Sequence, residues 1–228
     1  MDSESSPPVN GEQNSTRREF IGRSATVAGG VAMLGGVGGS LVNAGAALAS
    51  GAASVLTAAQ MNTLTAVVDQ LIPADALGPG AVEAGVPTYI DRALAGSYSS
   101  DLSAYQGLLA MFDASAQSLG AANFPGLTVD QQVTVLQDFE AGTPPGLPAA
   151  DGTAAAGLFQ LLLEHLREGM FGDPMYGGNQ GLVGWDLIGY PGIQIVATEH
   201  QQAIGTVIKP SNKTAKSYGG KPYNGPPV

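Results

Sequence analysis

Residues 153–169 read TAAAGLFQLLLEHLREG, and this stretch decides the fold class. Its large apolar side chains recur every three or four positions, which is the period of a helix that buries one face. The expected buried face consists of Leu158, Leu161, Leu162, His165 and Leu166. Elsewhere the chain shows no clean alternation of apolar and polar residues over more than four positions, so strands can only be minor. The sequence therefore predicts an all-α fold.

Helical patterns also precede this stretch. Thr57 and Thr128 each open a capping box with a glutamine three residues later, which marks the start of a helix. Pro73 suits a helix end and Pro87 the first turn of another helix, whereas a Pro- and Gly-rich loop is expected at 142–152. Together these signals predict a small domain of about five helices, at residues 57–72, 87–94, 100–119, 128–139 and 153–169.

The composition excludes several classes of protein. With 44% apolar residues, the 228-residue chain can form a hydrophobic core, so it is not wholly disordered. It has no cysteine, which excludes disulfides, thiolate zinc sites, iron–sulfur clusters and a cysteine nucleophile. Its formal net charge of −10 argues against nucleic acid as a partner, since phosphate binding requires a basic surface. No Walker A, G-x-G-x-x-G or G-x-S-x-G string is present, so neither a nucleotide-binding nor a hydrolase motif is recognised.

The first 49 residues have the layout of an export signal. A polar stretch leads to Arg17, Arg18 and Phe20, which match the twin-arginine (Tat) pattern. The uncharged span that follows is rich in Gly, Ala and Ser, and is too weakly apolar for a stable transmembrane helix. Ala47-Leu48-Ala49 has the form of a cleavage site. We therefore predict a signal peptide at 1–49 that directs the chain through the Tat translocon to the periplasm. A Gly/Ala-rich linker after a chance Arg-Arg pair is the alternative.

Charge divides the rest of the chain. Residues 50–208 hold 2 basic and 15 acidic side chains, a net charge of −13, and we assign them to the helical domain. Residues 209–228 hold four lysines, no acidic residue and several Pro and Gly residues. Such a segment cannot bury enough apolar surface to fold alone, so an extended tail is expected. Its positive charge would let it fold back on the acidic domain or lie along an acidic groove of a partner.

The segment that follows the last expected helix combines aromatic residues with many glycines. Residues 172–192 hold the single Trp of the chain and seven Gly. Long ordered loops are usually functional, and aromatic side chains dominate the energetics of protein interfaces. We therefore predict a partner interface formed by Asp173, Tyr176, Gly177, Gly178, Asn179, Trp185, Tyr190 and Pro191. Trp185 is the expected anchor, and the competing interpretation is that it packs on the chain's own helices.

Two segments carry a family resemblance. The first spans residues 71–91, which begin LIPAD and end with Ile90-Asp91. The second spans residues 165–192, which contain EGMFGDP, YGGN, GW and LIGYPG in that order. With these motifs and the twin-arginine leader, the chain resembles the gluconate 2-dehydrogenase subunit 3 family over most of its length.

This resemblance implies a non-catalytic small subunit of a membrane-associated, flavin-dependent sugar or sugar-acid dehydrogenase. In such complexes the catalytic partner is a large subunit of the glucose–methanol–choline type, which holds FAD, and a multihaem cytochrome c often takes the electrons onward. The chain itself would bind no cofactor or metal and hold no catalytic residue. It would supply the Tat signal for a large subunit that is exported already folded. An export signal on a chain without a cofactor motif agrees with this expectation.

Isolated polar residues have structural explanations. His165 lies on an apolar helix face, where a lone histidine is usually a hydrogen-bonded core residue. A metal site that includes His200 is the alternative, although no metal-ligand spacing supports it. Glu164 and Glu168 are expected on a solvated helix face. Asp173, which precedes a proline, is expected to form an Asx turn, with a partner contact as the alternative.

Two other functions stay open at this point. A stand-alone periplasmic sugar-binding protein would stack the Trp185–Tyr190 region on a sugar, and it would be stable and monomeric alone. A small hydrolase that uses carboxylates would be active as an isolated chain.

Overall fold

The structure is a computed structural model that describes residues 54–219. The predicted export motif at Arg17, Arg18 and Phe20 lies outside the described residues, as do the cleavage site after Ala49 and residues 220–228 of the tail. The domain boundaries drawn from the sequence therefore stay predictions.

The described part of the chain is all-α, which confirms the predicted fold class. Between residues 54 and 219 it contains no strand, and Asp75 and Gly78 form one isolated bridge. No helix in this range has both the length and the apolar composition needed to cross a membrane. The α-helices are α3 (Ala58–Leu71), α4 (Val86–Leu94), α5 (Leu102–Ser118), α6 (Val129–Ala141), α7 (Ala149–Phe171), α8 (Val183–Ile188) and α9 (Glu199–Gln202). Short 3₁₀ turns are η1 (Ser99–Asp101), η2 (Phe124–Gly126), η3 (Pro174–Tyr176), η4 (Gln180–Leu182) and η5 (Ala215–Tyr218).

Local signals place most helix ends correctly. Thr57 and Thr128 form the predicted capping boxes at the starts of α3 and α6. Gly142 ends α6 in the left-handed region, at φ 73°. The predicted loop at 142–152 is too long, because α7 already begins at Ala149. Pro148 precedes it with extended backbone and the alanines that follow are strong helix formers, so the helix starts inside the expected loop.

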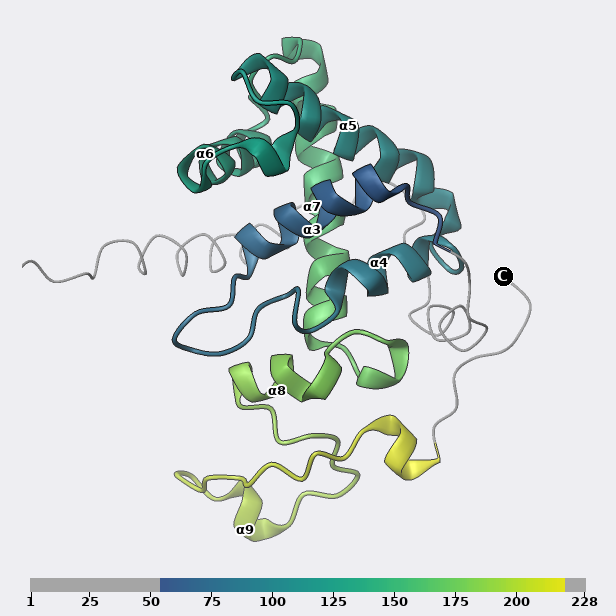
Figure 1. Cartoon of the computed structure of the whole chain (residues 1–228). Coiled ribbons are helices and arrows are strands. Elements are labelled where there is room, and N and C mark those ends of the chain that lie inside the picture. Colours follow the sequence, from purple (N-terminus) through teal and green to yellow (C-terminus); the bar gives the residue numbers. More distant parts are fainter. Residues whose placement is uncertain (1–53, 220–228) are drawn as a thin grey trace, which may run out of the picture. The chain divides into compact units, whose positions relative to one another are not determined.

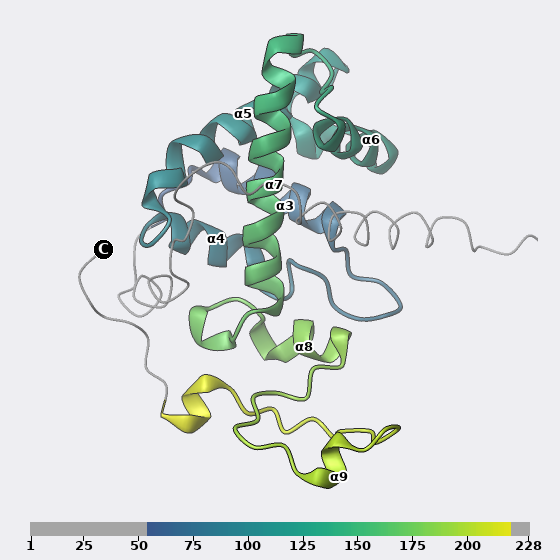
Figure 2. The ribbon, with the colours of Figure 1, turned by 180° about the vertical axis from the view of Figure 1, so that it is seen from behind.

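The longest helix, α7, organises the domain. It packs against α4, α5, α6 and α8, while α3 lies against α4, α5 and α6 (Figure 1). Figure 2, from the opposite side, shows α7 in front, with α3 crossing behind its middle. Because neighbouring helices cover α7 on several sides, its buried surface is wider than the buried face that the sequence predicted. Phe159 and Leu163 are buried, whereas Leu158 and Leu161 are only half-buried.

A carboxylate holds the beginning of the described chain. Asp91 of α4 is buried, and its Oδ1 accepts hydrogen bonds from the backbone N–H groups of Val55 and Leu56, at 3.1 and 2.9 Å. The side chain of Leu56 is buried as well. The chain therefore joins the helical core immediately before α3 begins.

Candidate functional site

The Gly- and aromatic-rich segment after α7 is not the long loop that its sequence predicted. It contains the turns η3 and η4 and the short helix α8. Each of these elements is too short to show a helical period in the sequence, which explains the wrong interpretation. We use the name clamp segment for residues 172–192. Figure 1 shows it at the C-terminal end of α7.

Glycines bring the clamp segment into direct backbone contact with α7. A Cβ atom at Gly178 would collide with the carbonyl group of Gly169, and one at Gly184 would collide with that of Met170. The backbone N–H of Asn179 donates to the carbonyl of Gly169, at 2.7 Å. Glycine is required here because the two backbones approach too closely for any side chain between them.

Asn179 ties the clamp segment together internally. Its side chain is fully buried and its φ of 45° is in the left-handed region. Its Nδ2 donates to the carbonyl of Gly172 at 2.9 Å, and its Oδ1 accepts from the backbone N–H of Gly184 at 2.8 Å. Both ends of this amide are therefore used within the chain.

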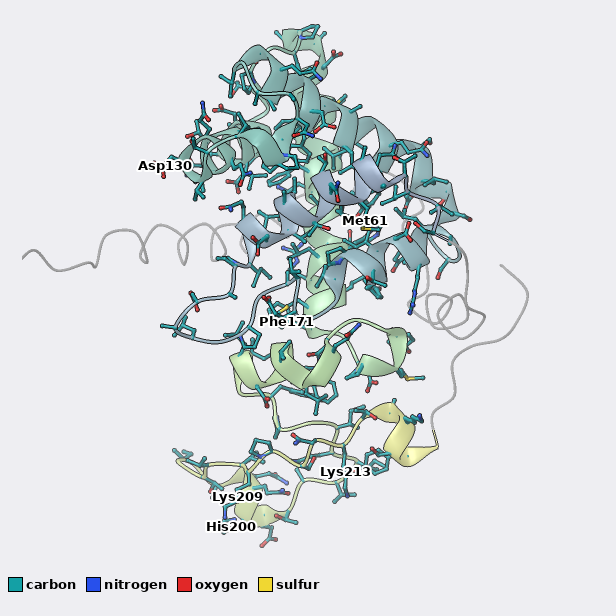
Figure 3. The ribbon with its side chains drawn as sticks, viewed as in Figure 1. Met61, Asp130, Phe171, His200, Lys209 and Lys213 are labelled. Carbon is teal, nitrogen blue, oxygen red and sulfur yellow. The ribbon has the colours of Figure 1, made fainter. Side chains whose placement is uncertain are left out.

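Trp185 faces the chain's own core. Its side chain is 4% exposed, and its Nε1–H donates to the carbonyl of Phe171, at 2.9 Å. The ring of Tyr190 meets it edge to face, with centroids 4.8 Å apart. Figure 3 labels Phe171 at the end of α7, where the clamp segment begins. The geometry thus favours the second interpretation of Trp185, that it packs on the chain's own helices.

The predicted interface residues fall into two groups. Gly178, Asn179 and Trp185 are buried and present almost no area to another protein. The others are half-buried or exposed, namely Asp173, Tyr176, Gly177, Tyr190 and Pro191. The interface itself stays a prediction, and it can only involve the second group directly.

Asp173 forms the predicted Asx turn and has a second role. Its Oδ1 accepts from the backbone N–H of Met175 at 2.9 Å, and its Oδ2 accepts from the backbone N–H of Ala215 at 2.7 Å. This carboxylate therefore connects the clamp segment to the tail. The second contact has no sequence signal, because the two residues are far apart in the chain.

The described part of the tail folds back on the clamp segment, which is one of the two possibilities that its charge left open. The N–H of Ser211 donates to the carbonyl of Pro191, and the N–H of Ile193 donates to that of Lys213, both at 2.8 Å. The hydroxyl of Tyr218 donates to the carbonyl of Ile193 at 3.2 Å. Backbone hydrogen bonds hold this part, and the sequence did not indicate these contacts because it suggested charge attraction instead.

His165 is the hydrogen-bonded core residue that the sequence predicted. It is 2% exposed, and its Nδ1 lies 2.9 Å from the hydroxyl oxygen of Tyr105. The ring of Tyr98 stacks on it with centroids 4.2 Å apart. Burial lowers the pKa of His165 to about 4, against a small opposing effect of the Asp101 charge.

Glu168 lies beside this histidine and does not form part of a solvated face. Its carboxylate is half-buried and accepts hydrogen bonds from the hydroxyls of Tyr89 and Tyr98, at 3.2 and 3.0 Å. Burial raises the pKa of Glu168, although the two hydrogen bonds oppose the shift. The pKa values of both tyrosines are also raised, chiefly by burial and then by the Glu168 charge. Glu164, one turn earlier, is exposed as predicted.

The histidine should make stability depend on pH. The pKa of His165 is 6.5 in the unfolded chain and about 4 in the folded chain. Between these two pH values the unfolded chain binds a proton that the folded chain does not, so the free energy of unfolding should fall as the pH falls. The expected loss from pH 7 to pH 5 is about 2 kcal/mol. Glu168 acts in the opposite direction, because a raised carboxyl pKa favours the folded chain at lower pH, and it should reduce the net loss.

Urea unfolding at pH 7 and pH 5 measures this difference. His165→Gln should remove most of the pH dependence, whatever its effect on stability at pH 7. His200→Gln, at an exposed position on α9, is the matched control and should retain it. An unchanged pH dependence in His165→Gln would contradict the assignment.

The described residues can be compared with two alternatives from the sequence, a metal site and a sugar-binding site. Between residues 54 and 219, no three His, Asp or Glu side chains gather as metal ligands. An open hollow of about 550 Å³ has no aromatic side chain in its lining, which is formed by Asn62, Thr65, Ala66, Asp69, Val82, Glu83, Asn123 and Pro125. Trp185 and Tyr190 do not line this hollow. The Trp185 ring is covered, so a sugar cannot stack on that ring, whereas Tyr190 is exposed.

Comparison with known proteins agrees with the resemblance in the sequence. The sequence model of the gluconate 2-dehydrogenase subunit 3 family matches residues 58–192. The chain belongs to this family. The match begins with α3 and ends with the clamp segment. The contacts between α7 and the clamp segment therefore lie within the family region, whereas residues 193–219 follow it. Neither a curated protein nor a solved structure matches this family member.

Proposed function

We propose that this chain is the non-catalytic accessory subunit of a periplasmic, flavin-dependent sugar or sugar-acid dehydrogenase. The family match over the helical domain carries the proposal, because the family is a subunit of gluconate dehydrogenase complexes. The partner would be a large subunit of the glucose–methanol–choline type that holds FAD and oxidises the substrate. A multihaem cytochrome c could take the electrons onward and attach the complex to the membrane.

Three polar side chains that could act as an acid or base are hydrogen-bonded within the chain. His165, Glu168 and Asp173 all take part in hydrogen bonds within the chain. A general acid or base has to reach a substrate proton, and these groups are directed at tyrosines or at backbone N–H groups. The accessory subunit would therefore act by binding and stabilising the large subunit.

Export is the second part of the proposed function. The twin-arginine pattern at Arg17 and Arg18 would carry the large subunit through the Tat translocon in its folded, flavin-loaded form. A chain with no cofactor motif has no need of this route for itself, so a folded passenger accounts for the signal.

Replacing both Arg17 and Arg18 with lysine tests this export role. The paired guanidinium groups are the expected recognition element, and lysine keeps the charge but loses their planar geometry. Both this chain and the flavoprotein should then stay in the cytoplasm, as measured by immunoblotting and sugar-dependent dye reduction in cell fractions. Arg23→Lys is the matched control and should leave export intact. Flavoprotein that still reaches the periplasm with the double variant would contradict the passenger role.

A further inference from the structure

We propose that residues 193–210, which we call the arm, form the docking surface for the dehydrogenase large subunit. The inference rests on the proposed function and deepens it by locating the contact. The surface would consist of the exposed aliphatic side chains of the arm, with Lys209 at its end and Lys213 on the returning tail. Its complement on the partner would be an apolar groove with carboxylates at its rim.

The arm exposes aliphatic side chains to an unusual degree. Ile195 and Val196 are 70% and 76% exposed, and Ile204 and Val207 are 105% and 88% exposed. No residue from 193 to 219 is buried. Four aliphatic side chains with so much exposed area within 13 residues are apolar surface that a partner could cover.

Hydrogen bonds hold the arm in shape although its side chains are exposed. Its two ends are joined by the bonds from Ile193 to Lys213 and from Ser211 to Pro191. Within it, Thr198 caps α9, and the hydroxyl of Thr206 donates to the carbonyl of His200 at 2.9 Å. A surface that is already ordered loses less conformational entropy on binding, which favours affinity.

The lysines of the arm and the tail indicate which charge the partner's surface should carry. The arm itself holds one acidic residue, Glu199, and one lysine, Lys209. Lys213 and Lys216 lie on the returning tail, so residues 200–219 carry three lysines and no acidic residue. Figure 3 shows Lys209 and Lys213 together with His200 on the arm and the returning tail, apart from the helices that carry Met61 and Asp130. Lysines beside an aliphatic patch suit a protein groove with acidic edges.

Two other occupants fit less well. Arm-to-arm pairing of two copies would bring together the three lysines of residues 209–216 from each copy, with one acidic residue in each arm, Glu199, to offset them. An anionic lipid surface would repel the domain at 54–208, which holds 15 acidic and 2 basic residues. The arm also has neither Trp nor Phe, the aromatic residues that favour a membrane interface.

The test measures binding of the full chain to the FAD-containing large subunit, purified from the native host by its flavin absorbance and its sugar oxidation. Two double variants are used, Ile195→Ser with Val196→Ser, and Ile204→Ser with Val207→Ser. Leu77→Ser, at a residue 60% exposed in the loop before α4, is the matched control. Each arm variant should weaken binding about tenfold or more, since two apolar contacts are lost. The control should bind as the wild type does.

The arm variants should keep the wild-type melting temperature, because none of the changed side chains is buried. If the wild type binds and both arm variants bind equally well, the arm is not the docking surface and the proposed function stands. If the wild type does not bind the flavoprotein, the proposed function fails and the inference fails with it. If the variants instead lose only self-association or vesicle binding, a second copy or lipid is the occupant and the inference is overturned.

Discussion

Gly184→Ala should strongly destabilise the subunit. The new methyl group would lie on the carbonyl oxygen of Met170 at the end of α7, and 3.1 Å from the Oδ1 of Asn179. The obstacle is backbone, which cannot rotate away, so α8 would have to separate from α7. We expect a loss of about 3 kcal/mol in the free energy of unfolding, the upper end of the range for overpacking. Urea unfolding of the purified chain measures it.

Gly157→Ala provides a control of opposite sign. This glycine is exposed within α7, and a Cβ atom there would meet no atom within 4 Å. Alanine should raise the free energy of unfolding by up to about 1 kcal/mol, because it favours the helix. Equal stability of the two variants would contradict the close contact between α8 and α7.

The helices were predictable because their signals are local. Thr57 and Thr128 each cap a helix together with a residue three positions away, and Gly142 ends one by its own φ angle. Such features need no knowledge of the tertiary structure. The start of α7 and the short α8 were missed, because the Pro- and Gly-rich composition around them also suits a loop.

The candidate site was only partly predictable. The sequence identified the clamp segment as unusual, and the family match covers it. It did not show that Gly178 and Gly184 serve a backbone contact within the chain, since that contact depends on where α7 ends in space. The half-burial of Glu168 was missed for a similar reason, because two tyrosines distant in sequence approach it.

Two roles that the sequence placed in one segment, packing on the chain's own core and contact with a partner, belong to different segments in our interpretation. The clamp segment has its large aromatic side chain inside, whereas the arm that follows has its aliphatic side chains outside. Burial within a chain and contact with a partner require the same residue types, so composition cannot distinguish them. The exposed fraction of each side chain distinguishes them. Because Trp185 is buried and the aliphatic side chains of the arm are exposed, we expect the partner to contact the arm rather than Trp185.

Trp185→Ala should therefore cause the largest loss of stability. Truncation removes a buried indole ring and the hydrogen bond from its Nε1 to the carbonyl of Phe171. Large-to-small changes at buried aromatic positions cost about 3–5 kcal/mol, and we expect a loss in this range. Differential scanning calorimetry of the isolated subunit should show a lower melting temperature. Binding of the flavoprotein should be lost only at temperatures where the variant unfolds.

Trp185→Phe separates packing from hydrogen bonding. It keeps most of the ring but removes the Nε1–H donor, so it should cost less than the alanine variant, about 1–3 kcal/mol for a carbonyl left without its partner. At a temperature where both variants are folded, each should bind the flavoprotein with nearly wild-type affinity, since the ring presents almost no surface to a partner. An alanine variant that melts normally yet no longer binds would instead make Trp185 an interface anchor, because only a side chain outside the core can be removed without a cost in stability.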